Sequence, residues 1–185
     1  MDKSLTPDKE VARSFLNKLD NLEDIFTFQT FDDKKDENNF IYPCVKHGTF
    51  DEHYELLKKL NQKGAGIFVM VNRGDGIIHE GEKTCRTKSN VIAVRALFAD
   101  ADGVPIEPIM DICPPPHILV ESSPGKWHIY WLTNDTKLEE FTLRQVAIAK
   151  RFGTDSAVKD LPRVMRIPGF YHQKNEPFMT RLVTN

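Results

Sequence analysis

Apolar residues recur at helical spacing in three stretches of the chain. Before the first stretch, Thr6 suits the N-cap position and Pro7 the first position of a helix. The second stretch ends just before Gly64 and the third at Gly153, and glycine often follows the last turn of a helix. The spacing therefore predicts amphipathic helices over residues 7–19, 50–62 and 138–152.

Two pairs of short apolar segments predict β-hairpins. Residues 25–31 alternate apolar and polar side chains, and a charged turn separates them from residues 40–45. Residues 117–121 and 127–132 flank a Pro-Gly pair, which marks a tight turn. Residues 91–99 are almost continuously apolar, a pattern typical of a central strand. Further extended segments are predicted over residues 66–72, 163–170 and 178–183.

The order of these elements predicts an α+β fold. Helices and strands are mixed without a regular strand-helix-strand alternation, and the hairpins imply mostly antiparallel pairing. Residues 74–90 are polar and lack periodicity, which predicts a long irregular connection of a kind that often carries function. A chain of 185 residues suits one compact domain, and because no linker divides it, we expect a single domain over residues 1–185.

The composition excludes some classes of protein. The chain is 40% hydrophobic and 28% charged, as is ordinary for a globular protein. Its apolar runs are far shorter than the roughly 20 residues of a bilayer-spanning helix, and its charged N-terminus does not resemble a secretory signal. We therefore expect a cytoplasmic protein with no membrane partner. The cysteines lack the spacing of a zinc site and are expected to be reduced and structural: Cys44, Cys85 and Cys113.

The charge distribution is uneven. The net charge of -2 argues against a protein that holds nucleic acid by its overall charge, because such domains are usually basic. Residues 143–185, however, contain eight basic residues against three acidic ones, a local balance of +5. Because screening limits the reach of each charge to about 10 Å, this segment could bind phosphates on its own. Ordinary surface solubility is the alternative interpretation.

The sharpest chemical feature is the segment LFADADG, in which an apolar strand ends in Asp100 and Asp102. Residues two apart on a strand point to the same side, so the two carboxylates converge. A like-charged pair is costly unless a divalent cation compensates it, and carboxylate oxygens suit Mg²⁺ or Mn²⁺. The pair predicts a metal site, and a polar loop that merely follows a strand is the alternative.

Two later segments add groups that can bind phosphate. His128 follows the Pro-Gly turn and shares a strand face with Tyr130, although a lone strand histidine is more often structural. Farther along, Asp155 and Asp160 lie near two arginines three apart and a lysine, a set that can grip phosphates. A solvated, salt-bridged loop is the alternative here. The basic residues of this segment are Arg163, Arg166, His172 and Lys174.

Together these segments resemble the primase-polymerase domains of plasmid and phage replication proteins, the RepB-like branch of the archaeo-eukaryotic primase superfamily. The resemblance runs from about Gly64 to the C-terminus. It rests on the DxD pair, the histidine of the next hairpin, a later acidic residue and the segment RVMRIPGFYHQK, in that order. One position departs from the pattern, because many relatives carry serine where this chain has Lys126. Contacts to the triphosphate are therefore expected to differ in detail.

The resemblance implies a fold and an activity. The catalytic core would cover residues 64–185 and contain an RRM-like, mostly antiparallel sheet, with residues 1–63 as an added N-terminal portion of helices and a hairpin. The activity would be that of a DNA primase or polymerase, a nucleotidyltransferase that uses two Mg²⁺ or Mn²⁺ ions. The implied partners are template and primer DNA, nucleoside triphosphates, and a helicase domain or subunit.

The same resemblance implies roles for individual residues. Asp100, Asp102 and Asp155 would hold the metal ions, and Asp160 is the alternative third carboxylate. These first three residues and His128, which would contact the triphosphate, form the expected catalytic set. Phosphates of the nucleotide or the template would be held by Lys126, Arg163, Arg166, His172 and Lys174, with Asn72 and Arg95 as further candidates.

Two other classes of protein fit part of the pattern. Nucleotide-sugar transferases also carry a DxD pair at a strand end, but the RVMRIPG segment and the short chain argue against this class. A non-catalytic module that binds single-stranded nucleic acid through an RRM-like sheet would not need intact Asp100, Asp102 and His128. A rolling-circle nicking protein would need two histidines separated by one residue, and the sequence has no such pair.

Overall fold

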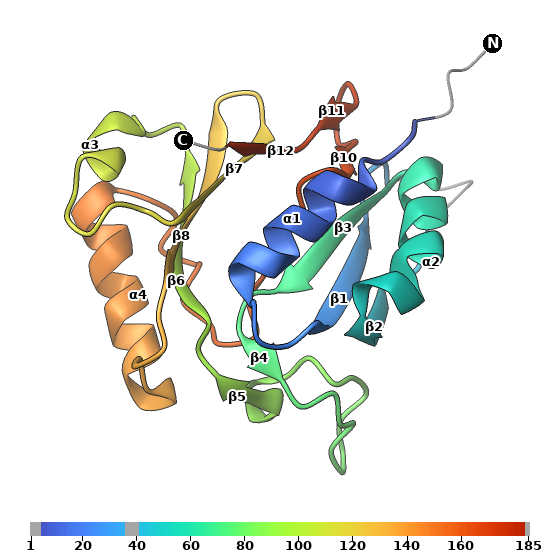
Figure 1. Cartoon of the computed structure of the whole chain (residues 1–185), viewed down its shortest axis with the longest axis horizontal. Helices are drawn as coiled ribbons and strands as arrows, with labels where there is room; N and C mark the ends of the chain where they lie inside the picture. Colours follow the sequence, from blue (N-terminus) through green and yellow to red (C-terminus); the bar gives the residue numbers. More distant parts are fainter. Residues whose placement is uncertain (1–4, 36–40, 184–185) are drawn as a thin grey trace.

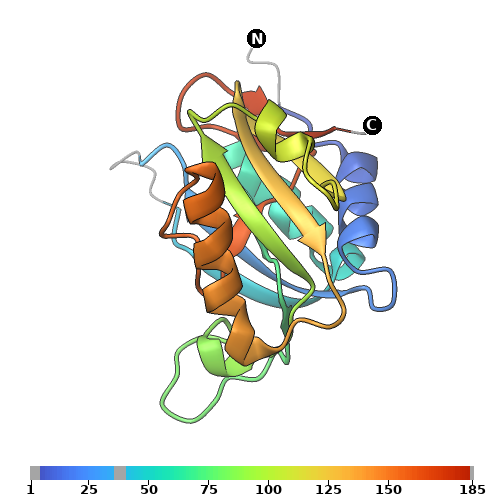
Figure 2. The ribbon, with the colours of Figure 1, turned by 90° about the vertical axis from the view of Figure 1, so that its left-hand side faces the viewer.

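The computed structural model describes residues 5–35 and 41–183, which form two four-stranded antiparallel sheets with helices around them (Figure 1). Helix α2 (Phe50–Lys63) covers one face of the first sheet, and α1 (Lys9–Leu19) lies between the two sheets. Helix α4 (Leu138–Phe152) runs along the outside of the second sheet (Figure 2). The predicted α+β class with antiparallel pairing is confirmed.

The first sheet joins segments from both ends of the chain. Its strand order is β2 (Cys44–Thr49), β1 (Ile25–Asp32), β3 (Ala65–Met70) and β9 (Val164–Arg166). The antiparallel pairing of β1 with β2 confirms a hairpin here. Its second strand, predicted over residues 40–45, begins only at Cys44, and residue 40 lies outside the described residues. Because β9 pairs with β3, the arginine-rich segment near the C-terminus extends a sheet that the N-terminal strands begin.

The second sheet has the order β12 (Arg181–Val183), β7 (Ile118–Ser123), β8 (Lys126–Leu132) and β6 (Ala96–Asp102). Strands β7 and β8 form the predicted hairpin around the Pro-Gly turn. In the pairing of β6 with β8, each aspartate of the DxD pair lies opposite a predicted phosphate-binding residue. These cross-strand pairs are Asp100 with His128 and Asp102 with Lys126.

The prediction of one central strand over residues 91–99 is wrong. The segment is divided into β5 (Val91–Ala93) and β6, and β6 lies at the edge of its sheet. The break falls beside Arg95, whose backbone N–H donates to the side chain of Asn72 and whose guanidinium forms a buried ion pair with Asp20. These bonds draw the chain out of a straight strand.

The exposed edge of β6 is capped by α4 and the loop that follows it. The Gln145 amide accepts a hydrogen bond from the Phe98 N–H at 3.0 Å and donates one to the Phe98 carbonyl at 2.9 Å. Farther along the edge, the Asp155 N–H donates to the Asp100 carbonyl at 3.2 Å. The edge is therefore paired, and the same bonds hold Asp155 beside the DxD pair.

The helices begin and end close to the predicted residues, with one correction. Helix α1 starts at Lys9 instead of residue 7, because the Asp8 carboxylate, and not Thr6, caps the N–H groups of its first turn. Helix α2 starts with a capping box between Thr49 and Glu52. Helix α4 has the predicted bounds, and Gly153 follows it at a φ of 68°, a conformation that favours glycine.

Short elements fill the connections. Strand β4 (Arg73–Gly74) pairs with β5, and β10 (Tyr171–His172) pairs with β11 (Phe178–Met179). A 3-10 turn over Lys88–Asn90 ends the predicted long loop, and α3 (Glu107–Met110) follows β6. In the described ranges, 5–35 and 41–183, no helix is long and apolar enough to cross a membrane.

Candidate active site

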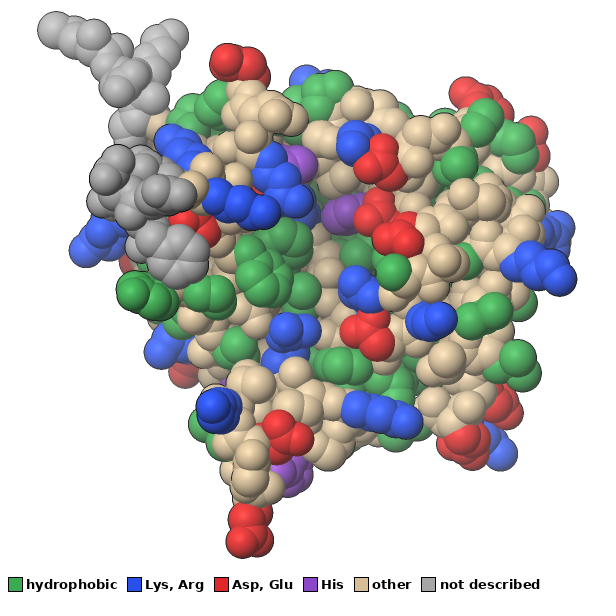
Figure 3. All heavy atoms as spheres, turned by 180° about the vertical axis from the view of Figure 1, so that it is seen from behind, with side chains coloured by type: hydrophobic (Ala, Val, Ile, Leu, Met, Phe, Trp, Pro, Cys, Tyr) green, Lys and Arg blue, Asp and Glu red, His purple; other side chains and the backbone are tan. Residues whose placement is uncertain are grey.

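A pocket of about 660 Å³ opens between the two sheets. Seen from behind, basic and hydrophobic side chains lie on one side of this region, and acidic side chains with a histidine lie on the other (Figure 3). The pocket brings together ten of the twelve predicted site residues. These are Asp100, Asp102, Lys126, His128, Asp155, Asp160, Arg163, Arg166, His172 and Lys174.

Three carboxylates crowd together at the end of β6. Asp100 and Asp102 point to the same face of this strand, and the loop after α4 is hydrogen-bonded to the Asp100 backbone through Asp155. Burial and the negative charges of Asp155 and Asp102 raise the pKa of Asp100 to about 6. The structure thus concentrates negative charge where a cation would relieve the repulsion.

The fourth acidic residue, Asp160, has a different environment. Its carboxylate contacts the Arg163 guanidinium, which also donates to the carbonyl of Ala157. The Asp155 carboxylate instead accepts the N–H of Ala157 at 2.8 Å, and its charge acts on Asp100. Between the two candidates for a third metal ligand, this geometry favours Asp155.

The carboxylates fit a divalent cation in their chemistry. Within the part of the chain that the structure describes, no group of three histidine, cysteine or acidic side chains stands close enough to hold a metal ion as it is. The Lys126 ammonium lies 2.6 Å from Asp102 Oδ2 and supplies a positive charge at this position. Oxygen ligands of this kind are those that Mg²⁺ and Mn²⁺ prefer.

His128 faces the carboxylates as a neutral side chain. Its Nε2 lies 4.0 Å from Asp100 Oδ1, and only 6% of the residue is exposed. Burial, with the charges of Arg166 and His172, lowers the pKa of His128 to about 3. Its Nδ1 has no hydrogen-bond partner among the described residues. The ring can therefore donate or accept a hydrogen bond in the pocket but carries no charge at neutral pH.

The basic side of the pocket is fixed by a buried ion pair. Arg166 donates to both carboxylate oxygens of Asp33, at 2.9 and 2.7 Å, and its guanidinium lies 4.5 Å from the centroid of the Phe68 ring. Asp33 also accepts the backbone N–H of Gln173 at 3.0 Å. Such a bidentate pair holds the arginine in one orientation and joins the end of β1 to the C-terminal segment.

Comparisons with known proteins indicate the class of this domain. Residues 101–183 match the sequence model of the RepB DNA-primase N-terminal domain, and this range includes most of the pocket. Residues 101–183 belong to a RepB-like primase domain. This family confirms the predicted class, a DNA primase or polymerase of the nucleotidyltransferase kind, and gives no support to a sugar transferase or a non-catalytic module.

Solved structures show the same fold as this primase domain. The archaeo-eukaryotic primase domain of the primase-polymerase of cyanophage S-2L has a TM-score of 0.73 at 15% identity, over 97% of this chain and 91% of that one. Primase RepB′ has a TM-score of 0.67 at 15% identity, over 94% and 56%. The catalytic domain of RepB′ in complex with initiator DNA has a TM-score of 0.63 at 16% identity, over 95% and 84%. The comparison with curated sequences gave no match.

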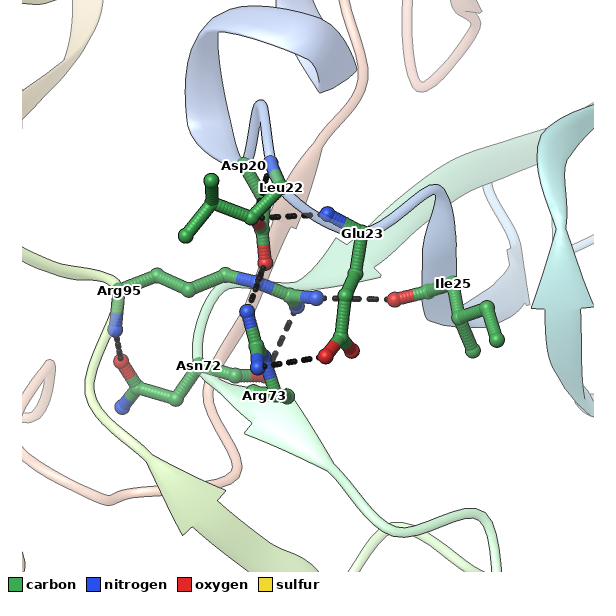
Figure 4. Close-up of polar contacts among 7 residues, drawn as sticks. All are labelled: Asp20, Leu22, Glu23, Ile25, Asn72, Arg73 and Arg95. Atoms are coloured by element: carbon green, nitrogen blue, oxygen red, sulfur yellow. Dashed lines mark hydrogen bonds and ion pairs between the residues drawn. The ribbon is translucent and has the colours of Figure 1, made fainter.

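In the structure, Asn72 and Arg95 lie outside the pocket. Their position corrects the prediction that they bind phosphates. Arg95 is buried and donates to Asp20 at 2.7 Å and to the Ile25 carbonyl at 2.8 Å (Figure 4). Asn72 donates to the carbonyl of Leu161 at 3.0 Å. Although burial opposes it, hydrogen bonds from Arg95 and Arg73 lower the pKa of Asp20 to about 2. These groups form a buried structural network.

Several residues that line the pocket or hold its lining in place were missed at the level of sequence. Asp33 stands in the run DDKKDENN, where nothing distinguishes it from solvated charges. Arg86 enters the pocket from the long loop, and Phe31 and Phe68 enter from strands β1 and β3. The alternation of side chains along these strands places both rings on one face but does not reveal that a pocket covers it.

Proposed function

We propose that this primase domain makes or extends primers on a DNA template, with the pocket as its nucleotidyl-transfer site. The observation that carries the proposal is the convergence of Asp100, Asp102 and Asp155 opposite the basic side of the pocket. This side, here called the basic wall, is lined by Arg163, Arg166, His172 and Lys174. A negative centre that needs a cation, facing positive groups that can hold phosphates, is the arrangement that phosphoryl transfer requires.

In this proposal Asp100, Asp102 and Asp155 hold two divalent ions. When bound, such ions make an attacking 3′ hydroxyl more acidic and neutralise charge on the leaving pyrophosphate. The carboxylates supply the negative charge and the orientation, and the hydrogen bond from the Asp155 N–H to Asp100 keeps the third carboxylate in place. Asp160 stays with Arg163 and does not bind metal.

The triphosphate lies between the carboxylates and the basic wall. Arg163 and Lys174 reach it from the C-terminal segment, and neutral His128 offers a hydrogen bond without a charge. His172 lines the same part of the pocket, and its Nδ1 donates to the Ser122 carbonyl, because a carbonyl only accepts. The neutral ring then has no proton on Nε2, so His172 binds a phosphate only when it is protonated. Arg166 contributes from a fixed position, since Asp33 already balances its charge.

Template and primer DNA and nucleoside triphosphates are the proposed substrates. The solved RepB′ catalytic domain was crystallised with initiator DNA, and this supports DNA as the template. A helicase domain or subunit is proposed as a partner on the family resemblance alone. The solved RepB′ chain is longer than the region shared with this protein, which covers 56% of it.

A primer-extension assay tests the proposal. A labelled primer on a DNA template, and the template alone, are incubated with nucleoside triphosphates and Mg²⁺ or Mn²⁺. We expect extension that depends on the metal ion and disappears with a chelator, and the bare template reports priming. A folded protein that binds DNA but yields no product with either metal contradicts the proposal.

Metal binding should weaken as the pH falls through 6. The raised pKa of Asp100, about 6, means that protons compete with the metal ion in this range, whereas an ordinary carboxylate stays ionised. Between pH 7 and pH 5 the ionised fraction of Asp100 drops about tenfold, and Mn²⁺ affinity should drop to a similar degree. Calorimetric titration at both pH values measures it. Equal affinities at pH 5 and pH 7 would contradict a metal site in which Asp100 titrates near pH 6.

Lys126 should compete with the metal ion for Asp102. Both partners of this ion pair are about half exposed, 47% and 55%, so it is easily exchanged. Lys126→Met should therefore tighten Mn²⁺ binding by about two- to fivefold, the range of an exposed ion pair, and raise the KM for the nucleotide as the ammonium is lost. Lys126→Arg keeps the charge and serves as the control. Weaker Mn²⁺ binding in Lys126→Met contradicts the competition.

A further inference from the structure

One face of the first sheet carries aromatic rings that remain accessible. Phe68 of β3 lies directly between Gln29 of β1 and Arg166 of β9, and Phe31 stands two residues beyond Gln29 on the same face. Both rings are only partly buried and line the pocket. On the opposite face Phe28 is fully buried in the core. The accessible rings are thus confined to the face that meets the site.

The two rings form a joined apolar surface. The centroids of Phe31 and Phe68 are 5.2 Å apart, and the rings meet edge to face at 77°. The Arg166 guanidinium lies over one face of the Phe68 ring, 4.5 Å from its centroid, and so places a fixed cation beside the remaining apolar surface. An apolar surface with charged borders suits a ligand that combines a flat apolar group with phosphates.

Arg86 completes this surface on its other border. Its Nε donates to the Gln29 side chain at 2.9 Å and its Nη1 to the Pro162 carbonyl at 3.1 Å. Gln29 is itself anchored, since its amide donates to the carbonyl of Thr30 at 2.9 Å. Within residues 5–35 and 41–183, no hydrogen bond engages the Nη2 group of Arg86 and no carboxylate forms an ion pair with it. Arg86 is held in place with donors left for an anion.

We propose that Phe31, Phe68 and Arg86 form a nucleobase seat, in which a base packs against the two rings and an adjoining phosphate binds Arg86. The proposal rests on the proposed function, because it places the base across the pocket from the carboxylates. The base belongs either to the template strand or to the incoming nucleotide, and both present the same chemistry to the seat. Contact between bases and aromatic rings tolerates any sequence, since every base has a flat apolar face.

Substitutions that keep an apolar side chain but remove the ring test the seat. The probes are Phe31→Leu and Phe68→Leu in the full chain. Binding of fluorescein-labelled oligo-dT is measured by anisotropy without metal or nucleotide, and the KM for dTTP is measured in primer extension. Phe152→Leu, a partly buried ring outside the pocket, is the matched control, and thermal unfolding verifies the fold of each variant.

Each result decides a distinct point. A loss of oligo-dT affinity of about tenfold in the Leu variants, the size expected for one stacked base, assigns the seat to the template. An equal rise in the KM for dTTP with unchanged oligo-dT binding assigns it to the incoming nucleotide. Wild-type values in both measurements, within about twofold, overturn the proposal.

An abasic oligonucleotide separates the base from the phosphate. If the template occupies the seat, the Leu variants should bind an abasic strand as tightly as wild type does, whereas Arg86→Gln should weaken both strands. A Leu variant that loses affinity for the abasic strand to the same extent as for oligo-dT contradicts a seat for the base. The DNA-binding measurement needs no catalysis. A chain that fails to extend primers would therefore refute the proposed function without affecting this test.

Discussion

Replacing Asp100 with Asn should reduce metal-dependent primer extension by at least about a thousandfold, which corresponds to about 4 kcal/mol of lost transition-state stabilisation. Asp100 lies at the centre of the three carboxylates, and burial together with the charges of Asp155 and Asp102 raises its pKa to about 6, a penalty that a cation would relieve. An amide oxygen keeps the size of the side chain but removes its charge. The measurement is the extension rate at saturating primer and nucleotide with Mg²⁺ and with Mn²⁺.

The stability of this variant separates catalysis from folding. Asn removes a repulsive charge, so the metal-free variant should unfold at a temperature equal to or above that of wild type. Asp111→Asn, an exposed aspartate at the end of α3, is the matched control and should retain full activity. An Asp100→Asn variant that extends primers within tenfold of wild type would remove Asp100 from the catalytic set.

Replacing Asp33 with Ala should destabilise the protein by about 3–5 kcal/mol, the cost of leaving a buried charge without its partner. The side chains of Arg166 and Asp33 are 7% and 1% exposed, so water cannot replace the lost carboxylate. Nucleotide affinity should fall as well, because Arg166 loses its fixed position beside the pocket. Urea unfolding and the KM for the nucleotide measure the two effects.

Two further variants test this interpretation of the ion pair. Removing both charges with Asp33→Ala and Arg166→Met should recover much of the lost stability, since no unpaired charge remains. Asp51→Ala removes the exposed ion pairs of Asp51 with Lys9 and Arg13, at a side chain that is 54% accessible, and should cost far less stability than Asp33→Ala. A cost for Asp33→Ala as small as that for Asp51→Ala would show that the buried pair does not hold the site together.

The parts of the site that sequence alone predicts are those set by local periodicity. The alternation of a strand places Asp100 and Asp102 on one face, and the Pro-Gly turn brings His128 back across from Asp100. The helix end at Gly153 then positions Asp155 beside the same strand. Each of these positions is fixed by neighbours in the chain or by one hairpin. The sequence pattern alone is therefore enough to predict it.

The parts that sequence alone misses depend on pairs of distant residues. Asp33 and Arg166 are 133 positions apart, and each resembles an ordinary surface charge until the first sheet brings them together. Arg95 lies near the DxD pair in sequence, yet its partner Asp20 draws it into a buried network away from the pocket. The break in the predicted central strand has the same origin.

Titration of the metal-free protein with Mn²⁺ tests most directly whether the carboxylates at the end of β6 form the metal site. Electron paramagnetic resonance or calorimetry at pH 7.5 compares wild type with Asp155→Asn and Asp160→Asn. We predict that Asp155→Asn weakens Mn²⁺ binding by at least about tenfold, as expected for the loss of a charged ligand, and that Asp160→Asn stays within about twofold of wild type. Binding in Asp155→Asn that equals wild type, or a loss confined to Asp160→Asn, would contradict the account.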